Sequence, residues 1–216
     1  MPRAPIACGQ TSKGTTAMRF FLRPGARLAA LAAATALLSG CISFGAEPPE
    51  SLLTLTPETM APAGSGNSGS EANALAVLEP EATARLNVIR VPVQVDDTRI
   101  AYLVDATWVD RPARLFRRLL AETIRARTGQ LVVDSDLAVV PPTVFLRGSL
   151  REFGYDAQAS AVVMRYDAVY SQADGTVRTR RFESVQTGIA PDAASVGPAL
   201  NRAANDVAMQ VADWLG

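Results

Sequence analysis

Apolar and polar residues alternate along three runs in the second half of the chain, at residues 144–155, 161–170 and 176–186. A period of two is typical of strands that bury one face and expose the other. In the middle run, Arg165 and Asp167 fall on the polar face. The apolar face of that run consists of Val162, Met164, Tyr166, Ala168 and Tyr170. Turn-forming residues separate the three runs, so the pattern predicts a β-meander.

Two longer segments have a period near that of an α-helix and predict amphipathic helices. The first begins near Asp110, which suits the N-cap position, and ends before Gly129. Its apolar stripe consists of Leu115, Phe116, Leu119, Leu120 and Ile124. The second spans residues 193–215, and its stripe consists of Val196, Leu200, Ala203, Ala204, Val207, Val211, Trp214 and Leu215.

Three shorter apolar segments, at residues 86–93, 100–104 and 131–133, predict further strands. Together with the meander and the two helices, they indicate a folded domain at residues 74–216. We predict an α+β fold in which a mostly antiparallel sheet is packed by two amphipathic helices. Two layers of this kind form a sandwich around one core.

The first 40 residues have the pattern of an export signal. Three arginines follow Met18 and precede an apolar run at residues 28–38. This run has the length of a signal-peptide core and is too short to span a bilayer as a helix. We therefore predict a signal peptide at residues 1–40, with either Met18 or Met1 as its true start.

Cys41 follows this segment in the run Leu38-Ser39-Gly40-Cys41. The run resembles the bacterial lipobox, in which the cysteine is lipidated and becomes the N-terminus after cleavage. Cleavage would remove Cys8, so the mature chain would keep one cysteine and no intramolecular disulfide. Ile42, in place of an aspartate, favours the outer membrane, and three acyl chains would anchor the protein firmly. The alternative is a soluble secreted protein in which Cys41 is incidental.

Residues 41–73 are rich in Pro, Gly, Ser and Glu, and we predict a lipidated N-terminus and a flexible tether there. Within this stretch, residues 51–55 are a candidate for a short strand that pairs back onto the domain. The glycines at 64–69 could instead form a phosphate-binding loop. That loop would need the Gly-Lys-[Ser/Thr] ending, which is absent.

Composition removes many enzyme classes. The chain has no His, which excludes the Ser-His-Asp triad, the Cys-His pair and nearly all zinc and haem ligand sets. Basic and acidic residues balance at 21 each, whereas a nucleic-acid binder would have a basic excess. Five basic residues fall within residues 1–40, so the mature part has a net charge of −5. Lys13, the one lysine, lies in the signal segment, so a serine nucleophile would lack a base. We expect no enzyme, no cofactor and no metal.

A few polar residues remain as candidates for chemistry. The carboxylate pairs Asp96–Asp97 and Asp134–Asp136 could act as acid and base or hold calcium. Aspartates at strand ends, however, often serve local backbone hydrogen bonds.

Three residues are candidates for a partner interface. Arg178 and Arg180 share one face of the last predicted strand and could meet a phosphate or an acidic partner. Alternatively, they pair with neighbours such as Asp167 or Glu183 on an exposed sheet face. Trp108, just ahead of the first helix, is either a core residue or an interface anchor.

A family resemblance rests on the region around this tryptophan. Its residues are Ala101-Tyr102-Leu103, Thr107-Trp108, Arg111-Pro112, Leu115 and Leu119-Leu120-Ala121-Glu122, followed by Arg151-Glu152-Phe153 in the meander. With the lipobox and the Ala-rich last helix, this order resembles the ABC-type transport auxiliary lipoproteins, which include the paraquat-inducible protein C lipoproteins. The resemblance covers residues 41–216. The chain departs from better-known members in its longer Gly/Ser tether and in Asp96-Asp97, where many have a tyrosine-containing segment.

The resemblance implies a non-enzymatic role in an ABC importer-like or MCE-type system that moves lipids between membranes. The lipoprotein would lie at the outer membrane and face the periplasm. There it would dock the MCE-type periplasmic subunit of a transport system that also contains an ABC permease and ATPase. Some members form a ring-shaped homo-oligomer. The alternative is an outer-membrane assembly lipoprotein that partners a β-barrel, as in lipopolysaccharide export. The sequence leaves the transported lipid, the oligomeric state and the partner-binding face open.

Overall fold

The computed structural model describes residues 51–70, 73–133 and 140–216. The predicted signal peptide, the choice between Met1 and Met18, the lipobox and Cys41 lie outside the described residues. So do Asp134 and Asp136. Among the described helices, none is long and apolar enough to cross a membrane.

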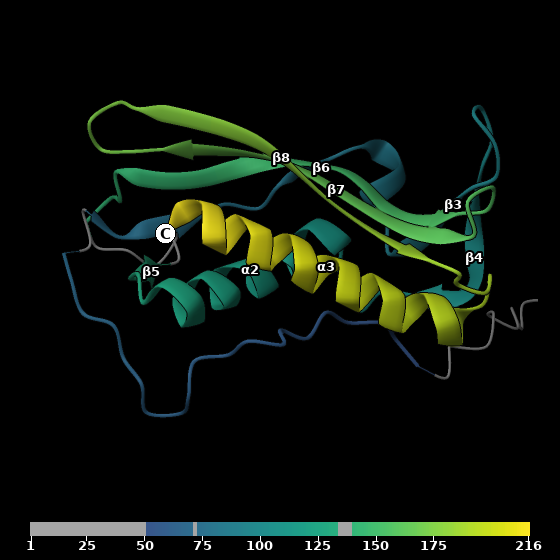
Figure 1. The fold of residues 1–216 in the computed structure, drawn as a ribbon, viewed down its shortest axis with the longest axis horizontal. Helices are drawn as coiled ribbons and strands as arrows, with labels where there is room; N and C mark the ends of the chain where they lie inside the picture. The colour runs from purple at the N-terminus through teal and green to yellow at the C-terminus, as the bar shows by residue number, and fades with distance from the viewer. Residues whose placement is uncertain (1–50, 71–72, 134–139) are drawn as a thin grey trace, which may run out of the picture. The chain divides into compact units, whose positions relative to one another are not determined.

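The predicted β-meander is confirmed and forms the largest part of the sheet (Figure 1). It consists of β6 (Val144–Asp156), β7 (Ala161–Ser171) and β8 (Val177–Thr187). Both neighbouring pairs are antiparallel. The five apolar residues assigned to the inner face of β7 are all buried, whereas Arg165 and Asp167 point to the opposite face. The period-of-two pattern therefore identified both the strands and their orientation.

The other edge of β6 pairs with strands that run parallel to it. These strands are β1 (Leu75–Val77), β2 (Glu81–Ala82) and β3 (Arg90–Gln94). Beyond them, β5 (Val132–Val133) pairs in parallel with β1, and β4 (Ile100–Thr107) pairs antiparallel with β3. The eight-stranded sheet is therefore mixed, although its longest pairs are antiparallel. The predicted α+β class is confirmed.

The strand predicted at residues 86–93 begins later than expected. Residues Ala84–Leu86 form a short 3-10 helix, η3, in which the Leu86 amide donates to the Thr83 carbonyl at 2.8 Å. The Leu86 side chain in this turn is buried in the core, and β3 starts only at Arg90. The prediction for residues 86–89 was wrong because a buried apolar residue in a tight turn resembles the inward residue of a strand.

Two helices cover one face of the sheet and lie side by side (Figure 1). They are α2 (Pro112–Thr128) and α3 (Ala193–Leu215), and every residue of the predicted α2 stripe is buried. Gly129 ends α2 with φ of 66°, as expected for a left-handed C-cap. The N-cap prediction was wrong, because α2 is capped by Arg111. The Asp110 carboxylate instead accepts from the Arg111 amide at 2.8 Å.

A bulge in β6 explains why its inward residues change parity. Leu146 and Leu150 are buried before the register shift, and Phe153 and Tyr155 are buried after it. One extra residue in a strand has this effect, because each residue step reverses the side-chain direction. The bulge therefore keeps both halves of a 13-residue strand facing the helices.

The segment at residues 53–61, which we call the strap, runs alongside the layer formed by α2 and α3 (Figure 1). Leu53 forms a parallel bridge with Trp108: its amide donates to the Thr107 carbonyl at 2.7 Å, and its carbonyl accepts from the Val109 amide at 2.9 Å. This contact matches the short pairing segment proposed at residues 51–55.

Side chains of the helices hold the rest of the strap. Asn201 Oδ1 accepts from the Thr56 amide, and Asn205 Oδ1 accepts from the Glu58 amide, both at 2.8 Å. Glu122 accepts from the Ala61 amide at 2.9 Å. The sequence predicts a flexible tether for these residues; in the structure, amide and carboxylate side chains of the helices satisfy the backbone amides of Thr56, Glu58 and Ala61.

Gly148 offers a test of how β6 and β7 pack. A Cβ at this position would lie 2.6 Å from two carbons of the Tyr166 ring, which is closer than non-bonded carbon atoms approach one another. We expect Gly148→Ala to lower the free energy of unfolding by about 1–3 kcal/mol or more, because overpacking displaces the ring or the strand. Gly66→Ala is the control, since a Cβ there meets nothing within 4 Å. Urea unfolding of both variants measures the difference; equal stability would contradict the close packing.

Asn205 offers a test of the strap. This buried side chain accepts from the Glu58 amide and donates to the Thr56 carbonyl at 3.0 Å. Asn205→Ala should leave these backbone groups unpaired and cost about 1–3 kcal/mol. Hydrogen exchange at the Glu58 amide should rise, because Asn205 Oδ1 is its acceptor, and exchange in β7 should stay unchanged. Arg202→Ala, an exposed position on the same helix, serves as the control. Unchanged exchange in the strap would contradict its docking by Asn205.

Candidate functional site

Arg178 and Arg180 lie on β8 at the exposed border of the core-facing side of the sheet. They are opposite Tyr170 and Ala168 of β7, both of which are buried toward the helices. The expected pairing with Asp167 or Glu183 was wrong, because those carboxylates point to the other face. Among the described residues, no carboxylate forms a salt bridge with either arginine.

Aromatic rings hold the two guanidinium groups instead. The Arg178 guanidinium lies 5.1 Å from the ring centre of Tyr170 and 5.0 Å from that of Trp214. The Arg180 guanidinium lies 5.2 Å from the ring centre of Phe182. Such cation–π contacts at exposed sites contribute about 0.5–1 kcal/mol each. They position a cation without using its N–H donors.

The rings also contact one another and form a continuous support. Trp214 meets Tyr170 and Phe182 edge-on, with centroid distances of 6.1 and 5.6 Å. We call this set, namely Tyr170, Arg178, Arg180, Phe182 and Trp214, the arginine–aromatic patch. Because Trp214 is near the end of α3, the patch joins the last turn of that helix to the β7–β8 hairpin. A guanidinium fixed in this way can donate two parallel hydrogen bonds to a carboxylate or phosphate.

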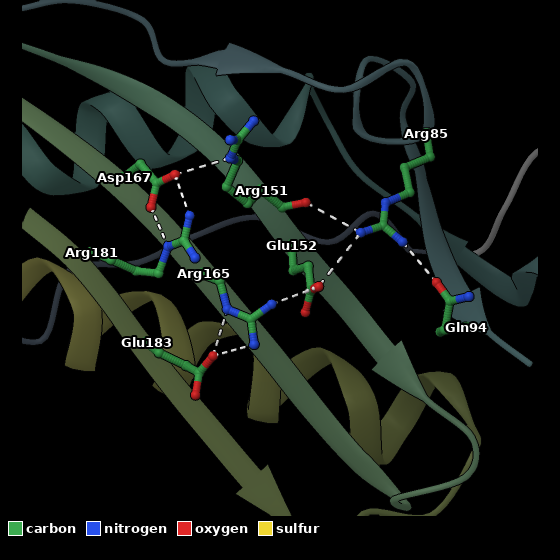
Figure 2. Close-up of polar contacts among 8 residues, drawn as sticks. All are labelled: Arg85, Gln94, Arg151, Glu152, Arg165, Asp167, Arg181 and Glu183. Atoms are coloured by element: carbon green, nitrogen blue, oxygen red, sulfur yellow. Dashed lines mark hydrogen bonds and ion pairs between the residues drawn. The ribbon is translucent and has the colours of Figure 1, made fainter. Parts of the chain in front are cut away.

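The opposite face of the sheet has a network of paired charges (Figure 2). Asp167 accepts from Arg181 Nε at 2.6 Å and from Arg151 Nε at 3.0 Å. The hydrogen bond from Arg181 is the main cause that lowers the pKa of the Asp167 carboxyl below its usual value. The carboxylate therefore stays charged at neutral pH.

A second set of residues continues this network toward η3 (Figure 2). Arg165 donates to Glu183 at 2.6 Å and to Glu152 at 2.7 Å. Arg85 donates to Gln94 at 2.8 Å. On this face each cation has a partner within the chain, so the face offers fewer free donors than the arginine–aromatic patch.

Trp108 belongs to the core. It is 1% exposed and stacks on Phe153 with a centroid distance of 5.4 Å. Its indole Nε1 has no hydrogen-bond partner within the structure. The prediction left open whether Trp108 is a core residue or an interface anchor; its burial beneath the strap identifies it as a core residue in this structure.

The carboxylate candidates do not form an acid–base site among the described residues. Asp96 Oδ1 accepts from the Thr98 and Arg99 amides at 3.0 and 2.8 Å. The bond from Thr98 is the main cause that lowers the pKa of Asp96. Asp96 therefore closes the β3–β4 turn, and Asp97 is exposed beside it. This arrangement agrees with the alternative of local backbone hydrogen bonding.

A cleft of about 320 Å³ lies between η3, β3 and β6. Asp97, Glu152 and Asp156 line it together with Arg85. Glu152 is already paired with Arg165, and Asp156 accepts from the Gln158 and Ala159 amides at 2.9 and 3.0 Å. In the described part of the chain, no group of three metal-ligating side chains is arranged to hold a metal ion.

Sequence reasoning found the two arginines of the patch but missed its aromatic support. The information was present, because the strand pattern puts Tyr170 and Phe182 on the helix side and the α3 stripe ends in Trp214. What was lacking was the register of the β7–β8 hairpin, which brings Arg178 opposite Tyr170.

Comparison with solved structures shows the same fold in other proteins. A crystal structure of protein XCC0632 from Xanthomonas campestris, described as DUF330, matches with a TM-score of 0.63 and 17% sequence identity. The match covers 76% of this chain and 94% of that one. A second crystal structure, of an uncharacterised protein, matches with a TM-score of 0.59 and 14% identity, over 70% of this chain and 97% of that one.

Sequence comparison identifies the family. No curated protein matches the chain. The family model described as "ABC-type transport auxiliary lipoprotein component" matches residues 53–212. These residues include the strap, every described strand of the sheet, all of α2, and α3 as far as Ala212. The chain therefore belongs to the family of ABC-type transport auxiliary lipoprotein components.

Proposed function

We propose that this protein is a lipid-anchored auxiliary component of an ABC/MCE-type transport system. It docks the periplasmic part of the transporter at the outer membrane and so supports lipid transport between the membranes. The observation that carries the proposal is the family match across residues 53–212. The role is non-enzymatic, and the side-chain arrangement supports docking because the arginine–aromatic patch presents two guanidinium groups that rest on aromatic rings.

The anchor in this proposal is Cys41. The lipobox residues Leu38, Ser39 and Gly40 precede it, and a basic segment and an apolar run precede them. Acylation of Cys41 would attach the mature chain to the membrane, with the folded domain in the periplasm. Several acyl chains are needed for stable attachment, since a single chain binds only marginally.

The docking surface in this proposal is the arginine–aromatic patch. Its two guanidinium groups keep their N–H donors, whereas the arginines of the opposite sheet face donate to carboxylates of the same chain. A partner with acidic side chains would therefore find fixed donors at the patch. Tyr170 and Phe182 are buried beneath it, and Trp214 is half-buried, which gives the arginines a rigid base.

The anchor can be tested by substitution of each cysteine. Cys41→Ala should leave an unprocessed precursor in the inner membrane that takes up no labelled palmitate, because the acylated thiol is gone. Cys8→Ala is the control and should be processed and labelled as the wild type is. Pulse labelling and membrane fractionation measure both results. Normal processing and labelling of Cys41→Ala would contradict the anchor.

The partner can be tested by mild crosslinking and detergent extraction of the wild-type protein. We expect it to co-purify with an MCE-type periplasmic subunit and with the ABC permease and ATPase, identified by mass spectrometry. Recovery of an outer-membrane β-barrel in their place would overturn the transport role and favour the assembly role. Recovery of the protein alone would also count against docking.

The patch can be tested with a double substitution. Arg178→Gln with Arg180→Gln should lower recovery of the MCE-type subunit by more than about tenfold, because each charge-assisted hydrogen bond contributes about 1.5–3 kcal/mol. The control is Arg202→Gln, which removes an exposed arginine from α3. Both variants should unfold cooperatively, and the double variant should do so at a temperature a few degrees lower, because it loses the cation–π contacts of Arg178 and Arg180. Equal recovery from both would show that the partner binds elsewhere.

A further inference from the structure

The end of the sheet that contains β4 exposes a group of aliphatic side chains. Val104 is 75% exposed, Val109 is 54% exposed and Leu52 is 49% exposed. Ile89 and Ile100 are also exposed. We call these five residues, namely Leu52, Ile89, Ile100, Val104 and Val109, the aliphatic rim. Exposed aliphatic residues that gather in one region often mark an interaction surface.

Backbone pairing brings Leu52, Ile89 and Val109 of the rim onto neighbouring segments, and β4 carries the other two residues. Leu53 bridges to Trp108, so Leu52 and Val109 are on neighbouring segments. The Trp108 amide donates to the Ile89 carbonyl at 2.8 Å, which adds a third segment. Ile100 begins β4, the outer strand of this end of the sheet, and pairs with Gln94.

An irregularity in β4 brings Val104 out to solvent. Between Pro92 and Arg90 the register with β4 shifts by extra residues, and Asp105 has φ of 56°. A non-glycine residue with positive φ is uncommon and is retained only where the surrounding structure holds it. The protein therefore retains an unfavourable backbone conformation at Asp105, next to Val104, whose side chain is 75% exposed.

Charges around the rim give no preference for an acidic or a basic partner. Arg90, Arg99 and Arg111 are exposed near it, and so are Asp97 and Asp105. Arg90 stacks on the ring of Tyr102 at 4.2 Å, and Arg99 pairs with Asp96. Because opposite charges are mixed, burial of the aliphatic side chains is the main gain available to a ligand here.

The chain length outside the domain indicates what covers the rim. Ten residues separate Cys41 from Leu52, and fully extended they span at most about 40 Å. The strap starts at the rim, so the rim is the part of the described domain that follows the proposed acyl anchor most closely along the chain. We propose that the aliphatic rim rests on the lipid surface and inserts Val104 and Val109 at the headgroup boundary. This proposal rests on the proposed anchor at Cys41.

This orientation leaves the arginine–aromatic patch free. The β7–β8 turn and the C-terminus are at the opposite end of the domain from β4 (Figure 1). With the rim on the membrane, Arg178, next to that turn, and Trp214, near the C-terminus, are at the far end of the domain from it. One end of the domain then meets lipid, and the other end is available to a protein partner.

Depth-dependent quenching tests the proposal on the full-length lipidated protein. In the wild type the Cys41 thiol is acylated and Cys8 is removed, so an introduced cysteine is the one reactive thiol. Val104→Cys is labelled with the fluorophore NBD in vesicles of phosphatidylethanolamine and phosphatidylglycerol that contain doxyl-labelled phosphatidylcholine. Val109→Cys is a second rim position in case the first variant fails to fold. Val177→Cys, 56% exposed and near the β7–β8 turn, is the control.

We expect the rim labels to shift to the blue and to lose emission when doxyl lipid is present, whereas the label at position 177 does neither. A rim label that stays in water on vesicle-bound protein overturns the proposal and leaves the anchor intact. A blue shift without doxyl quenching also overturns it, because a protein or a second copy then covers the rim. If the wild-type protein takes up label at Cys41 or does not remain on the vesicles, the anchor fails, and the rim proposal fails with it.

Discussion

Strand β6 holds the two parts of the sheet together. Along one edge it pairs with β7 over nearly its whole length, and along the other it pairs with β1, β2 and β3. Its inward-facing side chains must therefore stay directed toward the helices along the whole 13-residue strand, although a long regular strand would twist away from them. The bulge between Leu150 and Glu152 meets this requirement. Gly148 allows β6 and β7 to pack closely, because the Tyr166 ring occupies the space where a side chain at position 148 would lie.

Long elements with one buried face were predictable, because their patterns repeat over many residues. The meander and α3 agree with the sequence to within two residues at each end. Strand β1 was missed because its three residues are all buried and show no alternation. The strap was assigned to the tether because its contacts come from Asn201 and Asn205, about 145 residues further along the chain. Contacts at that separation leave no periodic trace in either segment.

The two faces of the sheet use arginine in different ways. On the open face, neighbouring strands provide carboxylates to Arg151, Arg165 and Arg181, and each such surface pair contributes little stability by itself. Their effect is to cover a sheet face on which the described residues place no helix with groups that water solvates well. On the helix side, Arg178 and Arg180 have rings as neighbours, and a ring leaves the guanidinium hydrogens available. Sequence reasoning located both arginines but could not assign their neighbours, since that depends on hairpin register.

The position of the strap has a mechanical consequence. If Cys41 is the anchor, any pull between the membrane and a docked partner enters the domain at Leu53, before it reaches a strand of the meander. The first bonds to take the load are those of Leu53 with residues 107 and 109, followed by those of Asn201 and Asn205. Rupture of these few bonds would release several residues of extra length while the sheet stayed folded. The strap would then detach before the docking domain unfolds. The chain length that it releases would accommodate relative movement of the two membranes.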